Sequence, residues 1–172
     1  IQLLERYISL KRGVRYNTTT GYKFVMSVVK KEPFGQRIIR DIKMSDAKLW
    51  FIKLYDDGYS YSTIASIRGV VKPAFQMAYT EDIIRRNPFE FRLDIIPNNT
   101  QKRVALSPKQ QEQFLEFTRN DKHFCRYLDE IKILLGTGMR ISELCGLTIS
   151  DLDFDRRRIR VDHQLVRTQD GK

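Results

Sequence analysis

The feature that most constrains the fold is the spacing of apolar residues in the first ninety positions, where they recur every three or four residues in four separate stretches. This spacing places apolar side chains on one face of a helix. The stretches end near Gly13, Pro33, Gly58 and Pro88, because glycine and proline stop helices and the residue before a proline avoids helical geometry. The sequence therefore predicts a domain of four helices over residues 1–90.

Polar residues that commonly cap helices mark the starts of the last three of these helices. We expect the second helix to begin after Asn17-Thr18, the third at Ser45 or Asp46, and the fourth near Ser60. Oxygen atoms of such side chains accept hydrogen bonds from the free amide groups of the first helical turn. The caps therefore favour separate short helices over one long helix.

A change of pattern separates this domain from the rest of the chain. Residues 91–106 show no helical period and contain Pro97-Asn98-Asn99-Thr100, so we interpret them as an interdomain linker. A second domain is expected over residues 107–172, and Ser107-Pro108 is a typical helix start for it.

The second domain alternates helical and extended patterns. A helix from about residue 124 to 135 is ended by Gly136-Thr137-Gly138, a short helix follows over residues 141–147, and the alternation of residues 159–165 predicts a strand. The side chains expected to be buried in its first two helices are Phe114, Leu115, Phe117, Tyr127, Leu128, Ile131, Leu134 and Leu135. The fold class is therefore mainly α, a four-helix domain followed by the N-terminal part of a mixed α/β domain with a small sheet.

The net charge of +10 is the first indication of function. Residues 1–90 carry a net charge of +7 and residues 91–172 only +3. Between Arg6 and Lys31 there are seven basic residues and no acidic residue. Clustered positive charge releases counterions from a polyanion, whereas an ordinary solvated surface mixes both signs of charge. The distribution favours nucleic-acid binding.

Several classes of protein are disfavoured. No apolar run approaches the length of a membrane span, and the charged start of the sequence does not resemble a signal peptide. Cys125 and Cys145 have neither the spacing of a disulfide framework nor that of a zinc site, so we expect buried thiols in a cytoplasmic protein. No carboxylate cluster suits a metal. Because Ile1 is not methionine and Lys172 follows a turn-like sequence, we expect a segment of a longer protein.

The most specific motif is the sequence from Leu134 to Leu147, Leu-Leu-Gly-Thr-Gly-Met-Arg-Ile-Ser-Glu-Leu-Cys-Gly-Leu. Its glycines allow a tight turn, after which Arg140 is expected in the first turn of a new helix with Glu143 on the same face. A guanidinium group at a helix start can bind phosphate oxygens together with backbone amides. An Arg-x-x-Glu pair without this context would be an ordinary surface ion pair.

This motif, followed by Ser150-Asp151-Leu152, resembles the first catalytic block of the tyrosine recombinases, or phage-type integrases, especially those of conjugative transposons. The helical unit ending in residues 82–89 looks like the family's core-binding (SAM-like) domain. The resemblance implies that Arg140 contacts the scissile phosphate and that Glu143 supports the active site. The family's later lysine, His-x-x-Arg block, further His or Trp and nucleophilic tyrosine all lie C-terminal to this point and have no counterpart here. None of the eight tyrosines is expected to be the nucleophile, since all of them precede Arg140. His163 is expected to face solvent or strand neighbours.

The resemblance also implies the substrate, which is double-stranded DNA held in a clamp formed by the two domains. In the family the second and fourth helices enter or flank the major groove; for Tyr22 and Tyr61, a role as core aromatics is an equal alternative. The residues expected to contact DNA are Lys11, Arg12, Arg15, Asn17, Thr19, Tyr22, Lys23, Tyr61, Thr63, Ser66, Arg68, Lys102 and Arg103.

The implied chemistry is strand cleavage and rejoining through a 3′-phosphotyrosine, without a cofactor or metal. Guanidinium groups would stabilise the charge that develops on the phosphate. A homo-oligomer of two to four copies on DNA and an excision factor are the implied protein partners. The alternative is a non-catalytic DNA-binding regulator with the same fold, which would not need the Arg140–Glu143 pair.

Overall fold

The computed structural model describes residues 1–166. The chain divides into two compact units, Ile1–Lys102 and Arg103–Lys172. The expected mainly α fold with a small sheet is confirmed in these residues. No helix among them is both long enough and apolar enough to cross a membrane.

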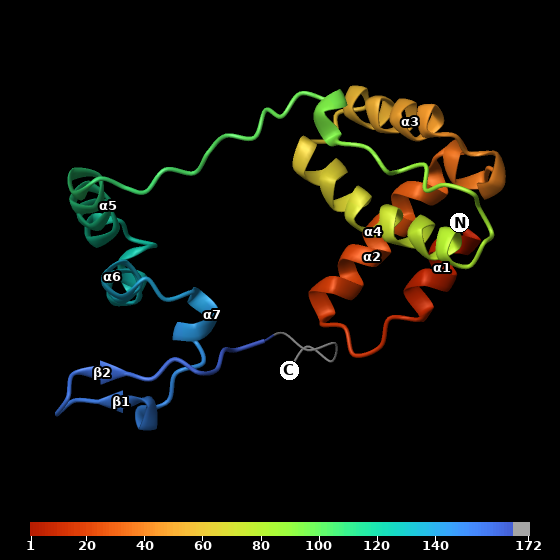
Figure 1. The fold of residues 1–172 in the computed structure, drawn as a ribbon. Helices are drawn as coiled ribbons and strands as arrows, with labels where there is room; N and C mark the ends of the chain where they lie inside the picture. Colours follow the sequence, from red (N-terminus) through yellow and green to blue (C-terminus); the bar gives the residue numbers. More distant parts are fainter. Residues whose placement is uncertain (167–172) are drawn as a thin grey trace. The chain divides into compact units, whose positions relative to one another are not determined.

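The first unit contains the four expected helices (Figure 1). They are α1 (Gln2–Ser9), α2 (Tyr16–Lys31), α3 (Met44–Asp56) and α4 (Tyr61–Thr80), with short 3-10 turns η1 (Pro33–Gln36), η2 (Ile39–Asp41) and η3 (Leu93–Ile95). Helix α4 packs against each of the other three helices. It is therefore the central helix of the unit, and its apolar face is buried along its length.

An aromatic cluster completes the core of the first unit. The ring of Phe89 lies 5.0 Å from that of Phe75, 5.4 Å from that of Phe51 and 6.2 Å from that of Trp50, measured between centroids. Phe34 stacks on Trp50 at 4.5 Å. Phe89 comes from the segment after α4, so the cluster fastens this segment to the helices.

Of the expected helix starts, the cap at Ser60 is confirmed, since its side chain accepts a hydrogen bond from the amide of Thr63. The expected start after Asn17-Thr18 is wrong. The carbonyl of Arg15 already accepts from the amides of Thr18 and Thr19, so α2 begins one turn earlier. In α3, the carboxylate of Asp46 accepts from the amide of Lys43 at 2.8 Å. Asp46 thus caps α3 from inside its first turn, and the expected start at Ser45 or Asp46 is wrong, because the N-cap residue is Lys43.

The expected start of the linker at residue 91 is wrong, because the residues up to Ile96 belong to the first unit. Ile96 is buried, and Phe91, Leu93 and Ile95 pack against the core of the first unit. The apolar residues in and around the turn η3 pack on this core without being spaced at helical intervals. A search for helical periodicity therefore does not find them. Residues 97–106, which have no regular secondary structure, are the remaining connection.

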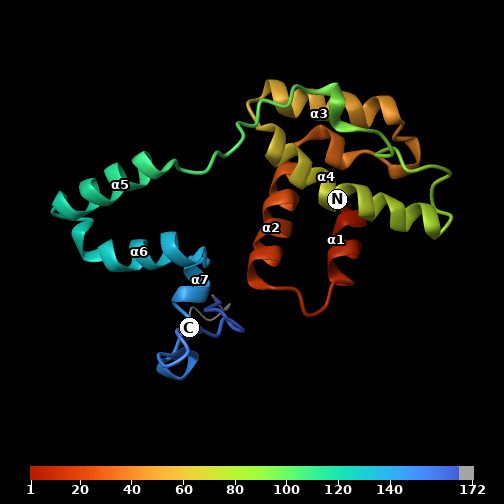
Figure 2. The same cartoon turned by 60° about the vertical axis from the view of Figure 1, so that its left-hand side comes forward.

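The described part of the second unit has short elements (Figure 2). They are α5 (Pro108–Asn120), η4 (Cys125–Tyr127), α6 (Leu128–Thr137), α7 (Ile141–Leu144), η5 (Ile149–Asp151), β1 (Leu152–Asp153) and β2 (Arg158–Ile159). The strands pair antiparallel, with Leu152 opposite Ile159. Ser107 caps α5 as expected, in a reciprocal capping box with Gln110.

The expectations for the strand, the buried side chains and the cysteines of this unit are wrong. The strand ends at Ile159 instead of residue 165, because the following residues bond to α7 and to the turn after it. Four of the side chains that were expected to be buried are exposed, namely Phe114, Phe117, Tyr127 and Leu135. Both cysteines are exposed, since they lie in surface turns at η4 and after α7.

Candidate functional site

The turn between α6 and α7 places Arg140 at the start of a helix. Gly138 ends α6 in the left-handed conformation (φ 71°), which favours glycine. Gly136, in contrast, lies inside α6 and does not form the turn. Arg140 is the N-cap residue of α7, and its carbonyl accepts from the amides of Glu143 and Leu144.

Glu143 binds Arg140 at two points. One carboxylate oxygen of Glu143 accepts from the backbone amide of Arg140 at 2.9 Å, and the other accepts from its guanidinium group at 2.8 Å. The hydrogen bond from the Arg140 amide and, to a smaller extent, the hydrogen bond from its guanidinium group lower the pKa of Glu143. The side chain of Arg140 is 79% exposed and that of Glu143 only 19%. The pair therefore presents a guanidinium group to solvent on a fixed carboxylate support.

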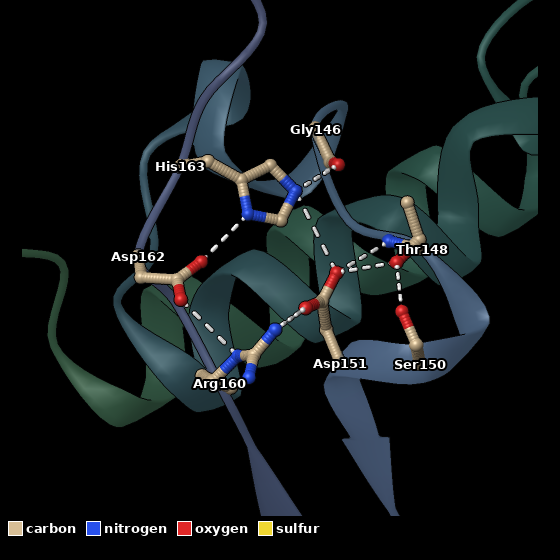
Figure 3. Close-up of polar contacts among 7 residues, drawn as sticks. All are labelled: Gly146, Thr148, Ser150, Asp151, Arg160, Asp162 and His163. Carbon is tan, nitrogen blue, oxygen red and sulfur yellow. Dashed lines mark hydrogen bonds and ion pairs between the residues drawn. The ribbon is translucent and has the colours of Figure 1, made fainter.

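A polar network lies beside α7 (Figure 3). Its centre is the buried carboxylate of Asp151, which accepts from the amide and hydroxyl of Thr148 at 2.8 and 2.7 Å. The hydrogen bond from the Thr148 hydroxyl and, to a smaller extent, the hydrogen bond from its amide lower the pKa of Asp151. Arg160 bridges the two carboxylates of the network, at 3.3 Å from Asp151 and 3.1 Å from Asp162. The Thr148-x-x-Asp151 spacing is a capping-box pattern.

The segment after β2 is bonded to α7 and to the turn after it. The amide of Leu165 donates to the carbonyl of Ser142 at 2.8 Å, and the Ser142 hydroxyl donates to the side chain of Gln164 at 3.2 Å. The ring of His163 contacts the carbonyl of Gly146 at 2.7 Å. A Cβ atom at Gly146 would lie 3.0 Å from the Leu165 nitrogen, so glycine permits this close approach. The expectation that His163 faces only solvent or strand neighbours is wrong.

Asp151, Asp162 and His163 are residue types that bind metals, and their ligand atoms lie within 4.8 Å of one another. However, the guanidinium group of Arg160 already bridges the two carboxylates. Each ring nitrogen of His163 already lies 2.7 Å from an oxygen, of Asp162 or of Gly146, so a metal would have to displace one of these contacts. These residues fit an internal hydrogen-bonded network better than a metal centre.

The basic residues of the first unit divide into paired and unpaired groups. Arg6 pairs with Glu81 at 3.0 Å and Lys30 with Glu5 at 3.4 Å. Within residues 1–166, no ion pair involves the exposed basic residues Arg12, Arg15, Lys23 and Lys31. Lys11 is also exposed, with its ammonium group 4.6 Å from the centre of the Tyr7 ring. These unpaired residues lie in α2 and the loop before it, and the exposed residues Arg85 and Arg86 after α4 are likewise in none of these ion pairs.

The other candidates on α2 and α4 are polar groups at the surface or at its edge. Asn17 and Ser66 are exposed, and Thr19, Tyr22 and Thr63 are half-buried. The hydroxyl of Ser66 donates to the carbonyl of Ser62. Tyr61 packs against the core of the first unit, which supports its alternative role as a core aromatic residue. Tyr22 is not among the residues that pack against this core.

Arg68 occupies a different place from the one expected. Its guanidinium group donates to the carbonyls of Phe89 and Phe91 and lies 5.9 Å from the centre of the Phe91 ring. It thus fastens the segment after α4 instead of facing outward. Lys102 and Arg103 are exposed in the connection between the units, as a phosphate contact would require.

Comparison with known proteins adds independent information. The model of the Phage integrase family matches residues 105–172. The transposase from transposon Tn916 of Enterococcus faecalis is 42% identical over 167 residues, which are 96% of this chain and 41% of that protein. The Tn1545 transposase of Streptococcus pneumoniae matches to the same extent. This chain therefore spans less than half the length of these curated relatives.

Solved structures share the fold. The Tn1549 transposon integrase in complex with circular intermediate DNA matches 98% of this chain and 55% of its own, with a TM-score of 0.92 and 43% identity. A lambda integrase dimer bound to a core site matches 99% of this chain and 56% of its own, with a TM-score of 0.70 and 19% identity. The second likeness shows the fold alone.

Proposed function

We propose, from the premise that this chain is homologous to the tyrosine recombinases of conjugative transposons, that it forms the DNA-clamping part of a site-specific recombinase. The complete enzyme would integrate and excise a mobile element by cutting and rejoining DNA strands. Its relatives are transposases and integrases, which favours an enzyme over a regulator with the same fold. We place it in the cytoplasm, where it would meet DNA.

The observation that carries this proposal is the exposed guanidinium group of Arg140, supported by Glu143 at the start of α7. In the proposed reaction a tyrosine hydroxyl attacks a backbone phosphate, which forms a 3′-phosphotyrosine and breaks the bond to the 5′-oxygen, releasing a 5′-hydroxyl strand end. A 5′-hydroxyl of another strand then attacks the same phosphate and releases the tyrosine. Negative charge develops on the nonbridging oxygens during each step. The fork of Arg140 would bind these oxygens, since guanidinium is permanently charged and planar.

The first unit would supply most of the DNA affinity. Its unpaired basic residues would bind phosphates, and hydroxyl and amide groups of α2 and α4 would contact phosphates or bases. Residues 97–106 could extend over roughly 33 Å, which would let the two units contact opposite sides of a duplex. We expect two to four copies to assemble on the DNA, with an excision factor as a further partner.

Binding of this chain to duplex DNA at several salt concentrations tests the proposal. Changing Arg12, Arg15 and Lys23 together to alanine should weaken binding and reduce the slope of log K against log salt by up to ~0.9 for each phosphate that is no longer neutralised. In the matched control, Arg6, Lys30 and Lys53 are changed together to alanine. This removes the same amount of positive charge, but from residues that are paired with carboxylates. The control should change the slope much less. Equal effects, or no salt dependence, would rule out this surface.

A further inference from the structure

The position of His163 imposes a charge state on its ring. One ring nitrogen lies 2.7 Å from a carboxylate oxygen of Asp162, and the other lies 2.7 Å from the carbonyl oxygen of Gly146 (Figure 3). Both oxygens are acceptors only, so each nitrogen needs a proton to form its hydrogen bond. A neutral imidazole carries one proton and would leave a lone pair facing an oxygen. The geometry therefore fits the doubly protonated, positively charged ring.

The helix that carries Arg140 depends on outside contacts for its position. Helix α7 has only four residues, and a helix of this length is not stable by itself. Residues 163–165 hold it through the ring of His163, the side chain of Gln164 and the amide of Leu165. These groups bond to Ser142 inside α7 and to Gly146 just after it. The helix is therefore fixed at both places.

We propose that protonated His163 is a positioning residue, which fastens residues 163–165 to the turn after α7 and so directs the guanidinium group of Arg140. The role in catalysis rests on the proposed function, whereas the fastening of α7 does not. Neither residue of the Arg140–Glu143 pair touches His163 in the hydrogen bonds and ion pairs of residues 1–166. The effect on Arg140 is transmitted through the backbone of α7.

The charged groups around His163 favour the same state. Asp162 faces it from its own segment and Asp151 faces it from η5 at 3.6 Å, while the turn after α7 contributes the uncharged carbonyl of Gly146. The positive charge of Arg160 opposes this state, but Arg160 pairs with the two carboxylates and not with the ring. The bond to Asp162, followed by that to Gly146, raises the pKa of His163. The bond to His163 in turn lowers the pKa of Asp162.

These shifts define a pH window. A histidine with a raised pKa contributes stability that is fully present below its ordinary pKa of about 6.5 and is lost as pH rises through the raised value. Asp151 and Asp162, with lowered pKa values, contribute stability that is present above about 4 and is lost as pH falls through the lowered values. The fastening of α7 should therefore weaken on the alkaline side when His163 loses its proton.

The first experiment is an NMR titration of this chain, which contains only two histidines, His123 and His163. Changing His163 to glutamine identifies its signals, and the pKa of His163 should lie above about 6.5 and fall in the Asp162→Asn variant. In both variants the amides of Leu144 and Cys145 should exchange with solvent roughly threefold to tenfold faster. His123→Gln is the control and should leave this exchange unchanged.

An ordinary pKa for His163, or unchanged exchange in both variants, would overturn the inference whether or not the chain binds DNA. Conversely, a failure of the salt experiment with a positive titration would reject the proposed function alone. If His163→Gln disturbs folding, Asp162→Asn tests the same point with the ring in place.

The second experiment measures cleavage by the complete integrase as a function of pH. His163→Gln should lower the cleavage rate at neutral pH and remove the alkaline decline due to His163, with DNA affinity unchanged. His163→Lys, which keeps a positive donor, should restore part of the rate. A purely structural role would predict no change of the pH profile and no rescue by lysine, and that result would overturn the positioning role.

Discussion

The two units are stabilised in different ways. Every buried hydrophobic residue among residues 1–166 lies between Leu3 and Ile96, in the first unit. In the described part of the second unit the buried residues are Thr118 and Asp151, both polar. In this chain, which spans less than half the length of its curated relatives, the described part of the second unit has caps, ion pairs and the network around Asp151 but no buried hydrophobic residue. Regions with little buried apolar surface open locally at low cost, so α7 should respond to changes that leave the first unit intact.

The same division applies to the proposed function. The first unit combines a rigid core with unpaired basic residues, which suits DNA affinity. The second unit presents Arg140 on a short helix held by polar contacts, which suits adjustment around one phosphate. Affinity and chemistry should therefore respond to different substitutions.

The largest effect is expected from Phe89→Ala. Phe89 is fully buried at the centre of the aromatic cluster, and removing such a ring costs about 3–5 kcal/mol. Urea unfolding followed by the fluorescence of Trp50, the only tryptophan, reports the first unit alone. The matched change Phe117→Ala lies in the second unit, which Trp50 does not report, and removes a ring that is 56% exposed. Amide exchange in α5 should show that it costs less than ~0.5 kcal/mol. Similar costs at the two positions would contradict the difference between the units.

A comparable effect, on rate instead of stability, is expected from Arg140→Lys in the complete integrase. Lysine keeps the charge but cannot bind two nonbridging oxygens with one planar fork, and loss of similar donors lowers rates by ~10²–10³. A nicked suicide substrate that traps the phosphotyrosine measures cleavage, and a parallel binding assay should show nearly unchanged affinity. Arg119→Lys, at an exposed position on α5, is the control.

Two results would contradict the catalytic role of Arg140. Cleavage near the wild-type rate would make it a structural residue. An equal loss of affinity and cleavage would make it a binding residue, and the proposed separation of affinity from chemistry would fail with it.

Local signals in the sequence predicted much of the fold and part of the site. Ser60 and Ser107 cap the helices that they were expected to cap, and Gly138 forms the turn that places Arg140 at the start of α7. The Arg140–Glu143 contact follows from their spacing, because residues three apart share a helix face. Each of these features depends on neighbours within a few residues.

Features that depend on distant residues could not be predicted in this way. Arg68 bonds to carbonyls more than twenty residues later, and His163 bonds to Gly146, seventeen residues earlier. Ile96 is buried by helices that precede it in the chain. The capping pattern of Thr148 and Asp151 was the one available signal for the network, since its spacing is local.

The smallest effect, and the sharpest comparison, is expected from the same substitution at two caps. The hydroxyl of Ser60 accepts from the amide of Thr63 at 3.2 Å, and that of Ser107 accepts from the amide of Gln110 at 3.3 Å. Replacing such a cap with alanine costs about 1 kcal/mol. Because α4 is central to the core, Ser60→Ala should lower the free energy of unfolding that Trp50 reports. Ser107→Ala should only speed amide exchange in the first turn of α5; a Trp50 transition shifted equally by both would mean that the two units unfold as one.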